Sequence, residues 1–266
     1  MRFFKYFVLP AICSFLIAGC SALDYHPYDT LIKGETSLTE KNIKRIESTL
    51  AGRSSFRFAV ISDTQRWYDE TALAVNALNR MNNVDFVIHC GDQADFGITD
   101  EFIKMRDMLS KLKMPWICLM GNHDYLGTGE FCYNKIYGKS NFGFTIGDTR
   151  FVCLNTNSLE DNSQPDFNYI NREQKELSGD IKKTFVAMHI KPFCVEFNNN
   201  IANDFQQSLK EFPNLQCCIN GHNHVLEQCD LFNDGTIYYG APSIDCKKIL
   251  LFTVNEEGYL YEEVDF

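Results

Sequence analysis

Five short polar motifs stand in order along the chain, and each follows the end of an apolar run. Together they contribute two carboxylates, three or four imidazoles and two side-chain amides. Donors of these types are sufficient to hold two divalent metal ions side by side, and such a pair is suited to attack at phosphorus. The motifs are Asp63-Thr64-Gln65, Gly91-Asp92-Gln93-Ala94-Asp95, Gly121-Asn122-His123-Asp124, the single His189 and Gly221-His222-Asn223-His224.

The apolar runs predict the strands that would position these motifs. The runs are 58–61, 86–88, 116–120, 142–146, 151–154, 185–188, 215–219, 237–239, 249–254 and 259–264. Helical periodicity is found over 70–81, 100–112, 171–178 and 201–211. Because strands and helices alternate through the first half, we expect parallel strands there, with the helices as crossovers. Turn residues at 233–235 and 255–258 predict two hairpins near the end.

These elements predict an α/β fold in which two sheets pack face to face and helices lie outside. An apolar content of 45% is sufficient for one sizeable core, and we expect a single domain over residues 56–266. In open α/β sheets, ligands gather at the carboxyl ends of the strands. Five candidate residues lie one to four positions past such an end: Asp63, Asp92, Asn122, His189 and His222. The sequence therefore predicts that five strands bring their polar residues to one site.

The first residues resemble a bacterial lipoprotein leader. Two basic residues precede a short apolar stretch over 6–18, which is too short to span a bilayer alone. Leu16-Ile17-Ala18-Gly19-Cys20 then has the pattern of a lipobox. We expect a signal peptide at residues 1–19, lipid on Cys20, and an exported, membrane-anchored protein of the cell envelope, with a weaker indication of the outer membrane. The alternative is an ordinary secretory leader with a chance cysteine.

Residues 20–55 are predicted to form a tether and then one helix. Ser37-Leu38-Thr39-Glu40 has the pattern of a capping box. Ile43, Ile46 and Leu50 follow at helical spacing and give the helix one apolar face.

The charge balance narrows the class of partner. The chain of 266 residues carries 25 basic and 35 acidic side chains, a formal charge of −10. Such a surface repels polyphosphate backbones, so a nucleic-acid partner is disfavoured. A small phosphorylated substrate is compatible, because bound metal ions reverse the charge locally. The chain also has 11 cysteines but no CxxC pair, and we expect few or no disulfides and no zinc ribbon.

The ordered set of motifs resembles the calcineurin-like metallophosphoesterases. The pattern D-x-Q, G-D-x-x-D, G-N-H-D, H, G-H-x-H runs through residues 56–266, and the family uses D-x-H in the first position. The resemblance implies a four-layer α/β/β/α sandwich, two divalent metal ions and hydrolysis of a phosphomonoester or phosphodiester. It also implies a role for each residue. Asp63, Gln65, Asp92 and His224 would bind the first metal, and Asp92, Asn122, His189 and His222 the second. His123 would protonate the leaving oxygen, oriented by Asp124.

Gln65 stands where the family has histidine. It exchanges an imidazole nitrogen for an amide oxygen, a harder and usually weaker donor, which favours Mn²⁺, Fe or Mg²⁺ over Zn²⁺ at the first site. The same departure supports an alternative, a binding or scaffold lipoprotein of the same fold with impaired catalysis. A nuclease is disfavoured by the acidic balance.

Several other residues near the motifs have structural interpretations. His89 is expected to be a core or supporting histidine, and Asp95 to brace its loop. Arg66 and Lys191 follow ligand positions and are candidates for a second charge on a substrate. Specificity is expected in the loops 124–141 and 155–170, which do not name the substrate.

Overall fold

The computed structural model describes His26 and residues 28–266. The predicted leader at 1–19 and Cys20, the predicted site of lipidation, lie outside the described residues. Within the described part of the chain, none of the helices has the length and apolarity needed to cross a bilayer.

The first sheet has five strands in the order β11-β10-β1-β2-β3. Three of them are parallel, β1 (Phe56–Ile61), β2 (Phe86–His89) and β3 (Trp116–Cys118). The helices α3 (Tyr68–Arg80) and α4 (Thr99–Leu109) connect them, as the alternating pattern predicted. The antiparallel hairpin of β10 (Lys248–Asn255) and β11 (Gly258–Asp265) completes the sheet beside β1.

The second sheet has six strands in the order β4-β5-β6-β7-β9-β8. Its strands are β4 (Phe142–Ile146), β5 (Thr149–Leu154), β6 (Lys183–Met188), β7 (Leu215–Asn220), β8 (Glu227–Asp230) and β9 (Ile237–Gly240). β5, β6, β7 and β9 are parallel to one another, and β4 and β8 are antiparallel edges. Its helices are α6 (Phe167–Glu176) and α7 (Ala202–Lys210).

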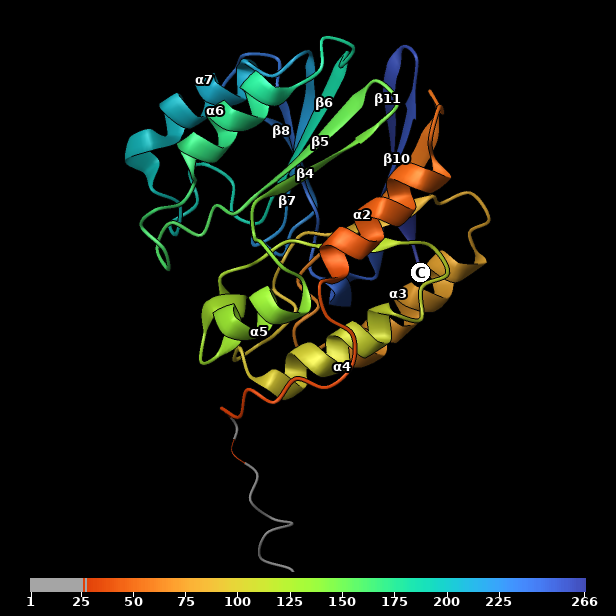
Figure 1. The fold of residues 1–266 in the computed structure, drawn as a ribbon, viewed down its shortest axis with the longest axis vertical. Helices are drawn as coiled ribbons and strands as arrows, with labels where there is room; N and C mark the ends of the chain where they lie inside the picture. Colours follow the sequence, from red (N-terminus) through yellow and green to blue (C-terminus); the bar gives the residue numbers. More distant parts are fainter. Residues whose placement is uncertain (1–25, 27) are drawn as a thin grey trace, which may run out of the picture.

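The sheets and helices form four layers, which confirms the predicted α/β/β/α sandwich. In Figure 1, α6 and α7 lie on one side of the molecule, and α3, α4 and α5 (Gly129–Ile136) on the other. Buried phenylalanines fill the space between the sheets. The Phe58 ring stacks on Phe252 at 4.9 Å between centroids and meets the edge of Phe151 at 5.2 Å. This aromatic core holds the two sheets together.

Helix α2 (Leu38–Thr49) packs against β3 and β4, which are edge strands of the two sheets. Its residue Ile46 and the following Leu50 are buried in the core between the sheets. The predicted capping box is wrong, because Ser37 adopts a left-handed φ of 55° and its side chain makes no capping hydrogen bond. The carbonyl of Ser37 accepts the Lys41 N–H instead, at 3.3 Å.

Three elements differ from the sequence prediction. Helix α5 lies in the predicted loop 124–141. Its buried face includes Cys132, Tyr133 and Ile136, and the helix is too short for these residues to give a helical periodicity in the sequence. Helix α6 begins before residue 171, because the Asp166 carboxylate accepts two backbone N–H groups and starts the helix there. Strand β8 was missed as an apolar run because it is a polar edge strand, although the hairpin turn at 233–235 was predicted.

The nine described cysteines are all free thiols. Seven of them are buried, whereas Cys229 and Cys246 are not. Buried free cysteines pack as small apolar side chains, as the sequence indicated.

Candidate metal centre

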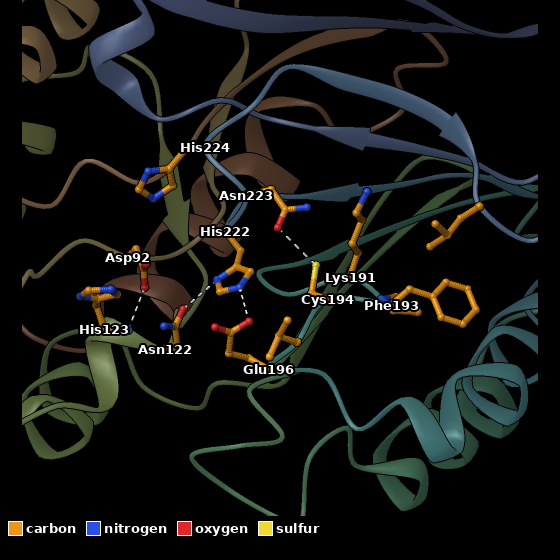
Figure 2. A pocket seen from close by; sticks show the side chains of 13 residues that line it. Asp92, Asn122, His123, Lys191, Phe193, Cys194, Glu196, His222, Asn223 and His224 are labelled. Atoms are coloured by element: carbon orange, nitrogen blue, oxygen red, sulfur yellow. Dashed lines mark hydrogen bonds and ion pairs between the residues drawn. The ribbon is translucent and has the colours of Figure 1, made fainter.

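The candidate residues meet at the carboxyl ends of five strands drawn from both sheets. Asp63 follows β1, Asp92 follows β2 and Asn122 follows β3; His189 follows β6 and His222 follows β7. Figure 2 shows Asp92, Asn122, His222 and His224 facing the same cavity. The predicted convergence of these residues on one site is therefore what the structure contains.

One group of donors is built around Asp63 and Asp92. Ligand atoms of Asp63, Asp92 and His224 all lie within 4.8 Å of one another. The Nε2 atom of His224 is 3.3 Å from Asp63 Oδ1, and the Gln65 amide donates to Asp92 Oδ2 at 3.2 Å. Both aspartates are buried, so their oxygens face one another with little access to water.

A second group is built around the Asn122 side-chain oxygen. This oxygen is 3.0 Å from His189 Nε2 and 3.0 Å from His222 Nδ1. His189 Nε2 also lies 3.4 Å from Asp92 Oδ1. Asp92 therefore belongs to both groups, as a bridging residue must.

The backbone fixes the direction of the His189 ring. Its Nδ1 donates to the carbonyl of Cys90 at 2.6 Å, which leaves Nε2 for the site. Burial alone would lower the pKa of His189, but the neighbouring Asp92 carboxylate outweighs burial and raises it to about 10. For Asp92, burial is outweighed by the His189 charge, which holds the pKa of the carboxyl below its ordinary value.

Glu196 is a site residue that the sequence did not indicate. Its Oε2 accepts from His222 Nε2 at 2.9 Å (Figure 2). Glu196 stands eight positions after β6 ends at Met188, so the strand-end rule that found His189 does not reach it. A carboxylate behind a histidine fixes its tautomer and orientation, and here it leaves His222 Nδ1 for the site.

Asp124 does not orient His123, contrary to what the family resemblance implied. Its buried carboxylate accepts the backbone N–H groups of Gly121 at 2.9 Å, and of Asp92, Gln93 and Ala94 at 3.0 Å each. Burial, with the nearby Asp92 charge, raises the pKa of Asp124 to about 7. Asp124 therefore holds the loop that carries Asp92.

His123 is oriented by the Asp95 main chain. Its Nδ1 lies 2.8 Å from the carbonyl oxygen of Asp95, and the side chain is 36% exposed at the cavity. The Asp95 carboxylate is 3.5 Å from Arg66, so this aspartate links its loop to the loop that follows β1.

The backbone at the site is strained. Asp63, Asp92, His222 and His224 all have left-handed φ values, between 50° and 72°. Such conformations cost about 1–3 kcal/mol each and cluster at functional sites. Gly121 is required by close approach, because a Cβ there would overlap the Asp92 carboxylate.

Two nearby residues have structural roles. His89 is buried, with Nε2 2.8 Å from Thr64 Oγ1 and Nδ1 accepting the Gly91 N–H, and burial lowers its pKa to about 4. Lys191 is buried and forms an ion pair with Glu227, so its charge is already neutralised within the protein.

The donor set fits divalent metal ions. Asp63 Oδ1 is buried and accepts no well-aligned hydrogen bond, and its near polar neighbour is His224 Nε2 at 3.3 Å, so a cation beside this oxygen would compensate its burial. Carboxylate and amide oxygens with imidazole nitrogens suit Mn²⁺, Fe, Mg²⁺ and Zn²⁺. A cavity of about 710 Å³ opens over these donors and is large enough for a small substrate.

Solved structures with the same fold are only distantly similar in sequence. A dimetal phosphatase from Danio rerio is 13% identical with a TM-score of 0.63, over 79% of this chain and 99% of that one. A purple acid phosphatase from yellow lupin (Lupinus luteus) seeds is 12% identical with a TM-score of 0.63, over 80% of this chain and 52% of that one. GAP50, described as the anchor in the inner membrane complex of Plasmodium, is 15% identical with a TM-score of 0.60, over 80% and 85%.

These structural likenesses show a shared fold. No match is found among curated proteins. The sequence model of the calcineurin-like phosphoesterases matches residues 56–226, well over half of the chain, and this protein therefore belongs to the calcineurin-like phosphoesterase family.

Proposed function

We propose that this protein hydrolyses a small phosphomonoester or phosphodiester with two divalent metal ions. The observation that carries the proposal is the position of Asp92, whose carboxylate is shared by the Asp63 and His224 group and by the Asn122 and His189 group. A shared carboxylate is the usual way to hold two ions about 3.5–4 Å apart.

The ligand assignment follows the two groups of donors. Asp63, Gln65, Asp92 and His224 would hold the first ion, and Asp92, Asn122, His189 and His222 the second. When bound, two such ions supply positive charge that polarises the phosphoryl group and activates water.

His123 is proposed to hold and deliver the proton for the leaving oxygen. The contact of its Nδ1 with the Asp95 carbonyl keeps a proton on that nitrogen and supports the ring when it is charged. Its other nitrogen, Nε2, is then free to meet the ester oxygen in the cavity.

Asp92→Asn tests the function directly. We expect the metal content to fall from two ions to near zero, because one change removes a ligand from both groups. Hydrolysis of a panel of aryl phosphates and bis(aryl) phosphates should fall by more than the roughly 10- to 100-fold loss typical of residues behind the ligands. Metal content and turnover are measured on the same preparation, with the exposed Asp204→Asn in α7 as the control. Undiminished hydrolysis by metal-free Asp92→Asn protein would contradict the proposal.

His123→Ala should retain both ions and lose activity selectively. Esters with poor leaving groups need the proton most, so their turnover should fall about 10²–10⁴-fold, while aryl esters with good leaving groups fall less. The measurement is a plot of log kcat against leaving-group pKa, which should steepen in the variant. An unchanged slope would remove His123 from proton transfer.

Glu196→Ala should weaken metal binding, because His222 loses the carboxylate that fixes its ring. We expect a loss of roughly 10- to 100-fold in metal affinity, with a smaller loss in Glu196→Gln. Calorimetric metal titration measures this without any turnover. Glu160→Gln is the control, because it removes a nearby negative charge without touching His222. Equal losses in Glu160→Gln and Glu196→Ala would mean that charge alone matters.

Gln65→His should change metal preference. In the structure the Gln65 Nε2 donates to Asp92, which leaves the amide oxygen for an ion. We propose that Mn²⁺, Fe or Mg²⁺ therefore occupies the first site in preference to Zn²⁺. The histidine variant should bind Zn²⁺ more tightly in competition with Mn²⁺, whereas equally tight Zn²⁺ binding to both sites of the unmodified protein would count against the proposal.

A second candidate function is a binding or scaffold protein with impaired catalysis. Gln65 favours it, because it weakens one ligand of the first site. A likeness of fold to GAP50, described as an anchor, shows that this fold is not restricted to proteins named as phosphatases. A protein loaded with two ions that hydrolyses none of the panel across several metals would support this candidate.

A further inference from the structure

The cavity over the metal centre has a second, apolar end. That end is lined by the segment 192–196 after β6 and by Leu231 after β8. Phe193 is 53% exposed and Val195 is 92% exposed. In Figure 2, Asp92 and His123 lie at the left and the Phe193 ring lies at the right. Lys191 and Cys194 are drawn between them.

The exposed Phe193 ring is held in place at a conformational cost. Its φ of 69° is left-handed, which is rare for a bulky side chain. Two hydrogen bonds of Asn199 enforce it: the Phe193 N–H donates to Asn199 Oδ1 at 2.7 Å, and Asn199 Nδ2 donates to the Cys194 carbonyl at 2.8 Å. The ring leans on Phe232, 5.1 Å away between centroids, and leaves its other side open. Backbone strain of this kind clusters at active sites and at segments that hold ligands.

The lysine between the two ends is already paired. Lys191, the lysine that lines the cavity, is neutralised by Glu227. Glu196 accepts a hydrogen bond from His222 and keeps its negative charge on the cavity wall, where it would repel a second phosphate. Among the described side chains that line the cavity, neither lysine nor arginine is left to receive a second phosphate. The far end is therefore suited to an uncharged group.

We propose that Phe193, Val195 and Leu231 form a specificity platform for the organic group of the substrate. The substrate class is a phosphoester of an alcohol that carries an aromatic ring on a short chain. With the phosphate at the Asp92 end, the chain passes Cys194 and the ring packs against Phe193. This inference rests on the proposed function, because the metal end fixes the position of the phosphate.

The first test compares two esters that differ in the apolar body alone. Ethyl phosphate and 3-phenylpropyl phosphate release primary alcohols of similar acidity, so their intrinsic reactivities match. The metal-loaded protein should prefer the phenylpropyl ester by about tenfold or more in kcat/KM, mostly through KM, since burying a ring removes apolar area from water. Phe193→Gly should bring this ratio towards one. Glycine adopts a φ of 69° without strain, which offsets the packing lost against Phe232 and the added entropy of the unfolded chain, so the variant should still fold.

The matched control is Phe131→Ala in α5. Phe131 is equally exposed, at 53%, but does not line the cavity, and its loss should leave the ratio unchanged. Val195→Asp is the second variant, because it places a charge on the platform at a fully solvated position. It should also lower the ratio.

A binding measurement separates this inference from the proposed function. Calorimetry with 3-phenylpropylphosphonate and ethylphosphonate, which carry no ester bond, measures the platform without turnover. Tighter binding of the phenylpropyl compound, lost in Phe193→Gly, supports the platform even if no ester is hydrolysed, and in that case the proposed function alone fails. Equal binding and equal kcat/KM for both members of each pair would overturn the platform while leaving hydrolysis intact.

Discussion

The structure depends on keeping two buried carboxylates, Asp63 and Asp92, close together. Carboxylates in a dry site are costly unless cations or hydrogen bonds compensate them. Here the compensation is partial: His189 and His224 lie beside them, yet Asp63 Oδ1 has no hydrogen-bond partner. The site is thus a preformed concentration of negative charge, and this charge is what gives divalent ions their affinity. The strained backbone and the charged interior are two aspects of the same arrangement.

The rest of the fold supports this arrangement from outside. Asp124 gathers four backbone N–H groups from two loops, and so fixes the loop that presents Asp92. The left-handed residues at the strand ends turn their side chains inward at a cost that local structure alone does not offset. The phenylalanine core around Phe58 provides the stability that pays for it, because it locks the two sheets that carry the ligands.

The sequence predicted the layers of the fold and the meeting of Asp63, Asp92, Asn122, His189 and His222 at one site, because both rest on local patterns. Apolar runs mark strands, and polar residues just past them mark the active edge of a sheet. Contacts between segments that are far apart in the sequence leave no local pattern of this kind. Glu196 reaches His222 from a loop, and Asp124 serves the backbone of the 91–94 segment rather than the ring of its neighbour. Ser37 matched a capping box in sequence, yet its backbone is left-handed and its side chain makes no capping hydrogen bond.

The position of α2 bears on where the folding unit begins. The family match starts at residue 56, but Ile46 and Leu50 from the preceding segment are buried between the sheets. A chain that began at residue 56 would lack α2. The edge strands β3 and β4 would then lose their cover, and the phenylalanine core between the sheets would be exposed to solvent. Unprotected edges pair with other chains, so such a fragment would self-associate. The helix that precedes the region matched by the family model therefore also covers the neighbouring edge strands of both sheets.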